Sequence, residues 1–143
     1  MPRCWSALFL SLVLVAAQAV AECRLPTPDG GAPDGSENYI PTRENIFGTV
    51  ERVELPNVVV RNGRTKRLED VSVAKIDAIF SVYGGDSPLT ELKPGLQVWI
   101  WFVDCKRPKT GPAYAGYFEI FSSNPKDRAK LNRNGKIISV PHG

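Results

Sequence analysis

The sequence predicts a mainly β protein, a small barrel of five or six strands with one short helix. Three observations carry this prediction. Residues 46–54 alternate apolar and polar side chains, as a half-buried strand does. Turn residues such as Asn62-Gly63 separate short runs rich in β-branched and aromatic residues. Residues 96–105 (LQVWIWFVDC) are apolar on both faces, as expected of a central strand that is covered on two sides.

The strands can be placed in order along the chain. The first begins at Ile46, and Gly48 within it lacks a side chain, so this residue could bend the strand and let the sheet close. The turn at 55–57 separates it from the second strand. The ranges of the later strands are 58–60, 68–73, 96–105 and 113–122.

Other segments are less regular. Residues 74–85 fit either one helical turn or a continuation of the preceding strand. Ser87-Pro88 has the hydroxyl and the proline that are typical of a helix start, so a single helical turn is predicted over 89–92. Asn134-Gly135 and residues 137–140 predict a short edge hairpin near the C-terminus.

The N-terminal residues have the pattern of a secretory signal peptide. Arg3 precedes an apolar run over 7–17, and small residues end at Ala21. The run is shorter than the roughly 20 apolar residues that a membrane span needs. A buried N-terminal helix is the alternative, which the proline- and glycine-rich segment after it disfavours. We expect cleavage between Ala21 and Glu22 and a periplasmic or secreted product.

Cys23 raises the possibility of a lipoprotein. Lipid attachment requires a small residue directly before the cysteine, and Glu22 occupies that position. We therefore expect no stable membrane insertion after signal cleavage. Without the signal, two cysteines remain, Cys23 and Cys105, and an even count in an exported chain suggests that they form a disulfide. Two free thiols or an intermolecular bridge are the alternatives.

Four segments follow from these patterns: a signal peptide at 1–21, a flexible Pro/Gly-rich arm at 22–45, a barrel domain at 46–122 and a basic tail at 123–143. The net charge of the 143-residue chain is +3, and it falls by one without Arg3. This balance does not favour a nucleic-acid protein.

The barrel segment resembles the oligonucleotide/oligosaccharide-binding (OB) fold, and more closely small exported bacterial OB-fold-like domains of unknown function. The residues that carry the resemblance are GTVERVE (48–54), NVVVRNG (57–63), ELKPGLQVWIWF (91–102) and AYAGYFEIFS (113–122). A β-sandwich is the alternative, for which five or six strands are few. OB folds that bind polymers frame a groove with their first and fourth connections, but the first connection here is only 55–57.

Several catalytic chemistries are not expected. The only histidine is His142, next to the C-terminus, which argues against Ser-His-Asp and Cys-His arrangements. No cluster of cysteines and histidines suggests a metal site, and we expect neither metal nor cofactor. The adjacent carboxylates Glu69 and Asp70 would point to opposite faces of a strand, so they would not share one site.

Aromatic and basic side chains are the remaining candidates for a binding surface. Trp99 and Trp101 share one face of their strand. If that face is outward, they form a platform for a sugar, a peptide or a partner protein; the alternative is that they pack under the arm or the tail. Two loops supply basic candidates, with solvated loops as the alternative: Arg64, Lys66 and Arg67, then Lys106, Arg107 and Lys109.

The leading hypothesis is an exported, non-enzymatic binding module for a protein, a glycan or an anionic ligand. An inhibitor or immunity protein that blocks a secreted enzyme is the second hypothesis, and an enzyme that uses carboxylates alone is the third. Nucleic acid is not expected as a partner, because export separates the protein from it.

Overall fold

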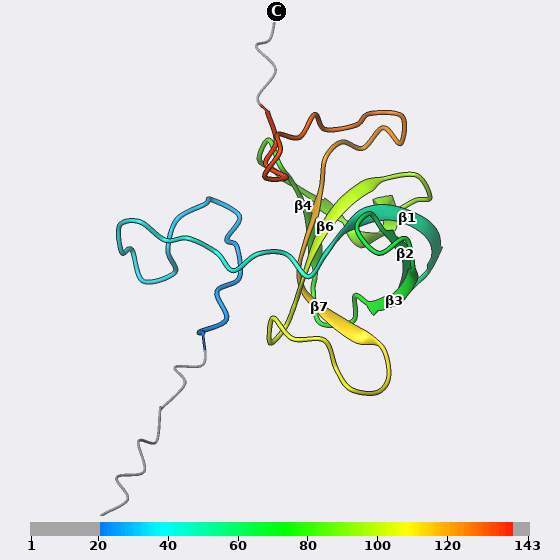
Figure 1. Cartoon of the computed structure of the whole chain (residues 1–143), viewed down its shortest axis with the longest axis horizontal. Helices are drawn as coiled ribbons and strands as arrows, with labels where there is room; N and C mark the ends of the chain where they lie inside the picture. Colours follow the sequence, from blue (N-terminus) through cyan, green and yellow to red (C-terminus); the bar gives the residue numbers. More distant parts are fainter. Residues whose placement is uncertain (1–20, 139–143) are drawn as a thin grey trace, which may run out of the picture.

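Five strands close into a barrel in the computed structural model, which describes residues 21–138 (Figure 1). They are β1 (Ile46–Glu54), β2 (Asn57–Asn62), β3 (Leu68–Ser72), β6 (Gln97–Phe102) and β7 (Ala113–Ile120). Around the barrel the order is β3-β2-β1-β6-β7, and a parallel pairing of β7 with β3 closes the circle. The mainly β, OB-like barrel that the sequence predicts is confirmed. The signal peptide predicted over 1–21 lies outside the described residues except for Ala21.

Strand β1 belongs to both sides of the barrel, and this requires a bend. It pairs with β6 over Ile46–Thr49 and with β2 over Gly48–Glu54, with a register shift between Val50 and Arg52. Gly48 lies where the two pairings overlap, and a Cβ at this position would sit 2.1 Å from the carbonyl oxygen of Arg61. Gly48 therefore allows the close approach of β2. The register shift between Val50 and Arg52 then bends the strand.

Two further strands extend the barrel beyond the predicted set. Residues 74–85, which fit either a helical turn or a strand, contain β4 (Ala78–Ser81). It pairs in parallel with the end of β7 and antiparallel with β5 (Asp86–Pro88). The prediction that Ser87 caps a helix is wrong, because Ser87 pairs with Ile79 inside this ladder. Pro88 precedes the single 3₁₀ turn η1 (Leu89–Glu91), which has no side-chain cap.

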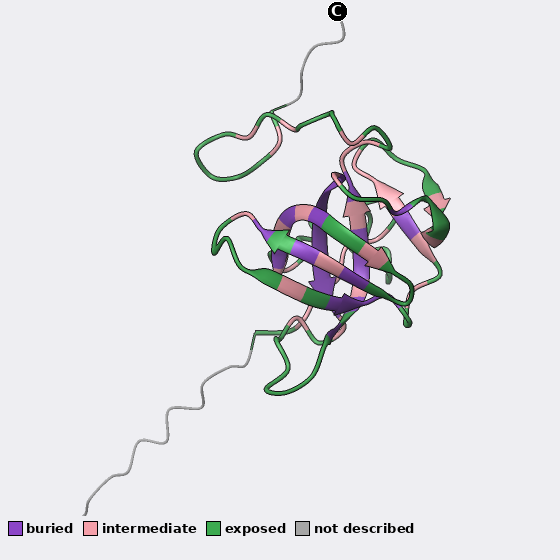
Figure 2. Cartoon of the chain, turned by 90° about the vertical axis from the view of Figure 1, so that its right-hand side faces the viewer, coloured by how far each residue is buried: buried purple, intermediate pink, exposed green. Residues whose placement is uncertain are grey.

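The core follows the alternation of the strands (Figure 2). Inward side chains come from every barrel strand and also from β4, and the bulkiest of them, Phe102 and Phe118, are fully buried. All six residues of β6 are buried, as the apolar pattern predicts, because the core covers one face and other segments cover the second.

The N-terminal arm is attached to the barrel at both of its ends. A disulfide joins Cys23 to Cys105, with 5.5 Å between their Cα atoms, so the predicted bridge is confirmed. The backbone N–H of Thr42 donates to the carbonyl of Arg24 at 2.8 Å, and the N–H of Arg24 donates to Oγ1 of Thr42 at 2.9 Å. Between these anchors the arm projects from the barrel as a loop (blue to cyan in Figure 1).

The C-terminal segment returns over the outer face of β6. The backbone N–H of Ala129 donates to Oε1 of Gln97 at 2.7 Å. Leu131 and Ile137 then form an isolated antiparallel bridge around a turn that begins at Asn132. The predicted edge hairpin is present in this form up to residue 138; its last two residues lie outside the described part of the chain.

Candidate binding cleft

Trp99 and Trp101 lie on the outer face of β6, but other segments cover that face. Their exposed fractions are only 6% and 7%. Leu25 from the arm and three residues of the tail pack on the cluster that they form with Tyr117; the tail residues are Ala129, Leu131 and Ile137. The open aromatic platform is therefore absent here, and the alternative, packing under the arm and the tail, is what the structure has.

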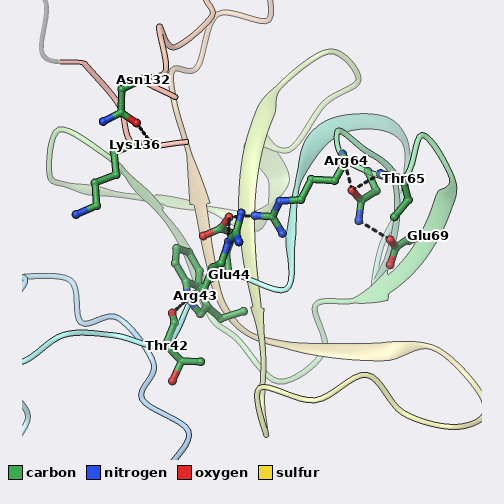
Figure 3. Close-up of polar contacts among 10 residues, drawn as sticks. Thr42, Arg43, Glu44, Arg64, Thr65, Glu69, Asn132 and Lys136 are labelled. Atoms are coloured by element: carbon green, nitrogen blue, oxygen red, sulfur yellow. Dashed lines mark hydrogen bonds and ion pairs between the residues drawn. The ribbon is translucent and has the colours of Figure 1, made fainter. Parts of the chain in front are cut away.

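Polar and ring contacts fix this outer cluster in place. The indole N–H of Trp101 donates to the carbonyl of Thr42 at 2.6 Å and so ties the arm to β6 (Figure 3). Tyr117 stacks on Phe80 from β4, with 4.9 Å between ring centres, and meets Trp101 edge-on at 5.6 Å. These contacts give the two tryptophans a structural role, since little of either ring reaches solvent.

Glu119 sits within the same cluster. Its neighbours in the strand ladders are Trp99 and Phe80. Burial among these rings raises the pKa of its carboxyl group, and a hydrogen bond with Tyr117 partly opposes this effect. Burial also raises the pKa of Tyr117, and the charge of Glu119 adds to the shift. Tyr117 is therefore held as a neutral hydrogen-bond donor.

The first basic loop, between β2 and β3, is organised by its own contacts (Figure 3). The side-chain oxygen of Asn62 accepts the backbone N–H groups of Arg64 at 2.8 Å and Thr65 at 3.2 Å. The guanidinium of Arg64 is paired with Glu44, which also contacts Arg43. Arg64 therefore has an internal partner.

The other two candidates in this loop remain exposed. Nζ of Lys66 donates to the carbonyl of Gly63 at 2.6 Å, and the side chain of Arg67 has no hydrogen bond or ion pair with another described residue.

In the second basic loop, between β6 and β7, Arg107 contacts residues of two barrel strands, Glu69 of β3 and Phe102 of β6. Its guanidinium bonds to Glu69 and lies 5.5 Å from the centre of the Phe102 ring. Glu69 also accepts a hydrogen bond from Asn62 at 2.7 Å, and only 10% of its side chain is exposed. One carboxylate thus connects both basic loops. Lys106 and Lys109 are both exposed, and neither side chain has a hydrogen bond or ion pair with another described residue.

A cleft of about 620 Å³ lies between this second loop and the outer face of β1, β2 and β3. The strands supply Arg52, Glu54, Asn57, Val59, Leu68, Glu69 and Asp70, and the loop side supplies Arg107, Pro108, Gly111, Pro112 and Ala113. Of the predicted basic residues, the structure brings only Arg107 into this cleft. Arg64, Lys66, Arg67, Lys106 and Lys109 do not line it.

The floor of the cleft is a cross-strand row with one unpaired charge. Val59 lies between Arg52 on β1 and Asp70 on β3. Arg52 is paired with Glu54 at 2.9 Å. The Asp70 carboxylate has no hydrogen bond or ion pair with any other described residue. As expected from alternation, Asp70 faces outward while its neighbour Glu69 points to the other face of β3, where it contacts Asn62 and Arg107.

Sequence reasoning missed most of these cleft residues. Arg52, Val59 and Asp70 are 7 and 11 positions apart along the chain, and only the register of three strands makes them neighbours. The outward direction of Val59 and Asp70 could have been deduced from alternation. That of Arg52 could not, because the register shift between Val50 and Arg52 interrupts the alternation that would place Arg52 on the inward face with Val50. Which residues of the second loop lie above them could not be deduced either.

Comparisons with protein-family models, curated proteins and solved structures find no match for this chain. Within residues 21–138 no group of acidic, cysteine or histidine side chains is placed to hold a metal ion. The same residues include no helix with the length and apolar character needed to cross a membrane.

Proposed function

We propose that this protein is an exported, non-enzymatic binding module that takes its ligand in the cleft below the β6–β7 loop. The observation that carries the proposal is the position of the cleft. It lies against the outer face of β2 and β3, beside the loop that corresponds to the fourth connection of an OB barrel. OB folds bind oligomeric ligands on this face.

The lining of the cleft supports ligand binding. It combines apolar surface from Val59 and Leu68 with charged groups from both sides. Its volume falls within the range of about 300–1,000 Å³ that is typical of ligand sites. Arg107 and the disulfide at Cys105 hold the loop at the edge of the cleft, and a fixed wall loses less entropy on binding.

The export part of the proposal rests on two features that agree. Residues 1–21 have the composition of a secretory signal, and Cys23 and Cys105 are bridged. Disulfides persist in oxidising compartments such as the periplasm or the extracellular medium. With its sulfur in the bridge, Cys23 has no free thiol for lipid attachment.

The β6–β7 loop favours a second candidate function, inhibition of a secreted enzyme. The loop is exposed, basic at Lys106 and Lys109, and held at its start by the disulfide. A rigid basic loop suits insertion into an acidic active site. The double variant Lys106→Glu and Lys109→Glu distinguishes inhibition through the loop from binding in the cleft, because neither residue lines the cleft.

A direct test exposes the protein, with its disulfide intact, to an array of microbial glycans and an array of extracellular bacterial proteins. Leu68→Glu places a charge on the exposed apolar part of the cleft, and we expect it to reduce binding at least tenfold. Glu37→Lys, on the exposed arm, is the control and should bind as the wild type does. Binding that survives Leu68→Glu but is lost in the loop variant would transfer the function to the loop.

A further inference from the structure

The closure of the barrel between β3 and β7 is incomplete. Only two residue pairs join these strands, Val71 with Ala113 and Ser72 with Tyr114. The first part of β3, Leu68–Asp70, pairs with β2 on one side and has no strand on the other. An open strand edge presents backbone N–H and C=O groups that can pair with another chain. The cleft runs along this edge, since all three residues line it.

We propose that the cleft binds an extended segment of a partner protein, which adds as a strand beside Leu68–Asp70. This proposal rests on the function proposed above and names the class of ligand. In such strand addition the backbone supplies affinity, and pockets for alternate side chains supply specificity. The free edge is what separates this mode from a glycan lying across the face of the strands.

The side chains along the edge define what the segment must carry. Leu68 is 55% exposed and Asp70 is exposed, and both point to the outer face. Glu69 points the other way and is already satisfied by Arg107 and Asn62. The outward side chains of an added strand would therefore meet one apolar residue and one carboxylate without a partner. A segment with β-branched residues and a lysine or arginine opposite Asp70 fits this edge.

The other charged residues of the cleft are already paired, so Asp70 decides which charge the bound segment should carry. Arg52 is paired with Glu54, and Arg107 with Glu69. An acidic segment would meet an unpaired carboxylate and gain no free cation in the cleft lining. A basic side chain of the segment would form an ion pair with Asp70, which solvent partly screens because Asp70 is exposed. Asp70→Lys would replace this attraction with repulsion.

The test is a selection of random linear nine-residue peptides against the protein, followed by amide hydrogen exchange with the best binder. We expect enriched peptides to contain β-branched residues and a lysine or arginine. We expect Asp70→Lys to weaken the best binder at least tenfold while Glu37→Lys leaves it unchanged. Exchange at the amides of Leu68–Asp70 should slow when the peptide is added, which a contact made by side chains alone would not produce.

Four results would overturn the inference. Enriched peptides that bind Asp70→Lys as tightly as wild type would place the site elsewhere. Glycan binding that Leu68→Glu abolishes, with no peptide selected, would leave the cleft as a binding site but refute strand addition. Self-association through residues 68–70, seen as a dimer that Asp70→Lys separates, would show that a second copy of the chain occupies the edge. Absence of any glycan, protein or peptide ligand would refute the proposed function as well.

Discussion

Removal of the Cys23–Cys105 disulfide, by replacing both residues with alanine, should strongly destabilise the protein. The bridge spans a sequence separation of 82 residues that includes six of the seven strands. In the chain-entropy model, closing a loop of this length restricts the unfolded state by about 4.5 kcal/mol at 25 °C. Small domains have a total unfolding free energy of about 5–15 kcal/mol, so the loss would be a large fraction of the whole.

The bridge also has a local effect that the loop length does not describe. Cys23 is followed by Arg24 and Leu25, which hold the arm to Thr42 and to the outer aromatic cluster. Without the bridge the arm keeps these contacts but loses its covalent anchor. We therefore expect the arm to exchange its amide hydrogens faster, while the ladder between β1 and β2 stays protected until global unfolding.

The assay is urea unfolding followed by tryptophan fluorescence, with the oxidised wild type, the reduced wild type and the double-alanine variant measured at one pH. The reduced wild type and the variant should agree, and both should lie about 4 kcal/mol below the oxidised protein. A difference of less than about 1 kcal/mol would mean that the unfolded chain is already compact in this region. That result would refute the reasoning from loop length.

Two further predictions concern the barrel and its outer cluster. Gly48→Ala should cost at least about 3 kcal/mol in thermal or urea unfolding, because its Cβ would lie 2.1 Å from the carbonyl oxygen of Arg61. The control Gly31→Ala should change stability by less than about 0.5 kcal/mol, since its nearest neighbour would be 3.9 Å away. Glu119→Gln should stabilise the protein above pH 4.5, the usual pKa of glutamate, and should leave it unchanged at lower pH.

The sign of the Glu119 effect follows from its raised pKa. Burial makes the folded protein hold the proton more tightly than the unfolded chain does. The wild type therefore loses stability as the pH rises from the unfolded pKa through the folded one, whereas glutamine has no charge to bury. If the unfolding free energy of Glu119→Gln changed with pH in the same way as that of the wild type, the argument from burial would be contradicted. For Gly48, a wild-type melting temperature in the alanine variant would show that β1 and β2 can separate at low cost.

The sequence was sufficient for the elements whose cause is local. The alternation that starts at Ile46 marked β1, although a register shift interrupts it after Val50, and the apolar run around Ile100 marked the strand that is buried on both faces. The partner of Cys23 followed from counting, because Cys105 was the only other cysteine outside the predicted signal. The helix start predicted at Ser87 was wrong, because pairing of Ser87 with Ile79 in the β4–β5 ladder outweighed the local sequence preference.

The candidate site was largely beyond the reach of sequence reasoning. Alternation showed that Trp99 and Trp101 share a face and that Glu69 and Asp70 do not. It could not show that Leu25 and the tail cover the tryptophans. Nor could it show that Arg107 pairs with Glu69, 38 residues earlier in the chain.

The sequence by itself thus determined the β class, the positions of the five barrel strands and the faces of side chains within uninterrupted stretches of strand. The tertiary structure alone decided which face is covered and where the cleft lies. The reason is physical: a strand's alternation depends on the backbone of adjacent residues. Coverage depends instead on segments far away in the chain, and closure depends on a register in which β3 meets β7 at only two residue pairs. That short contact leaves Leu68–Asp70 open beside the cleft.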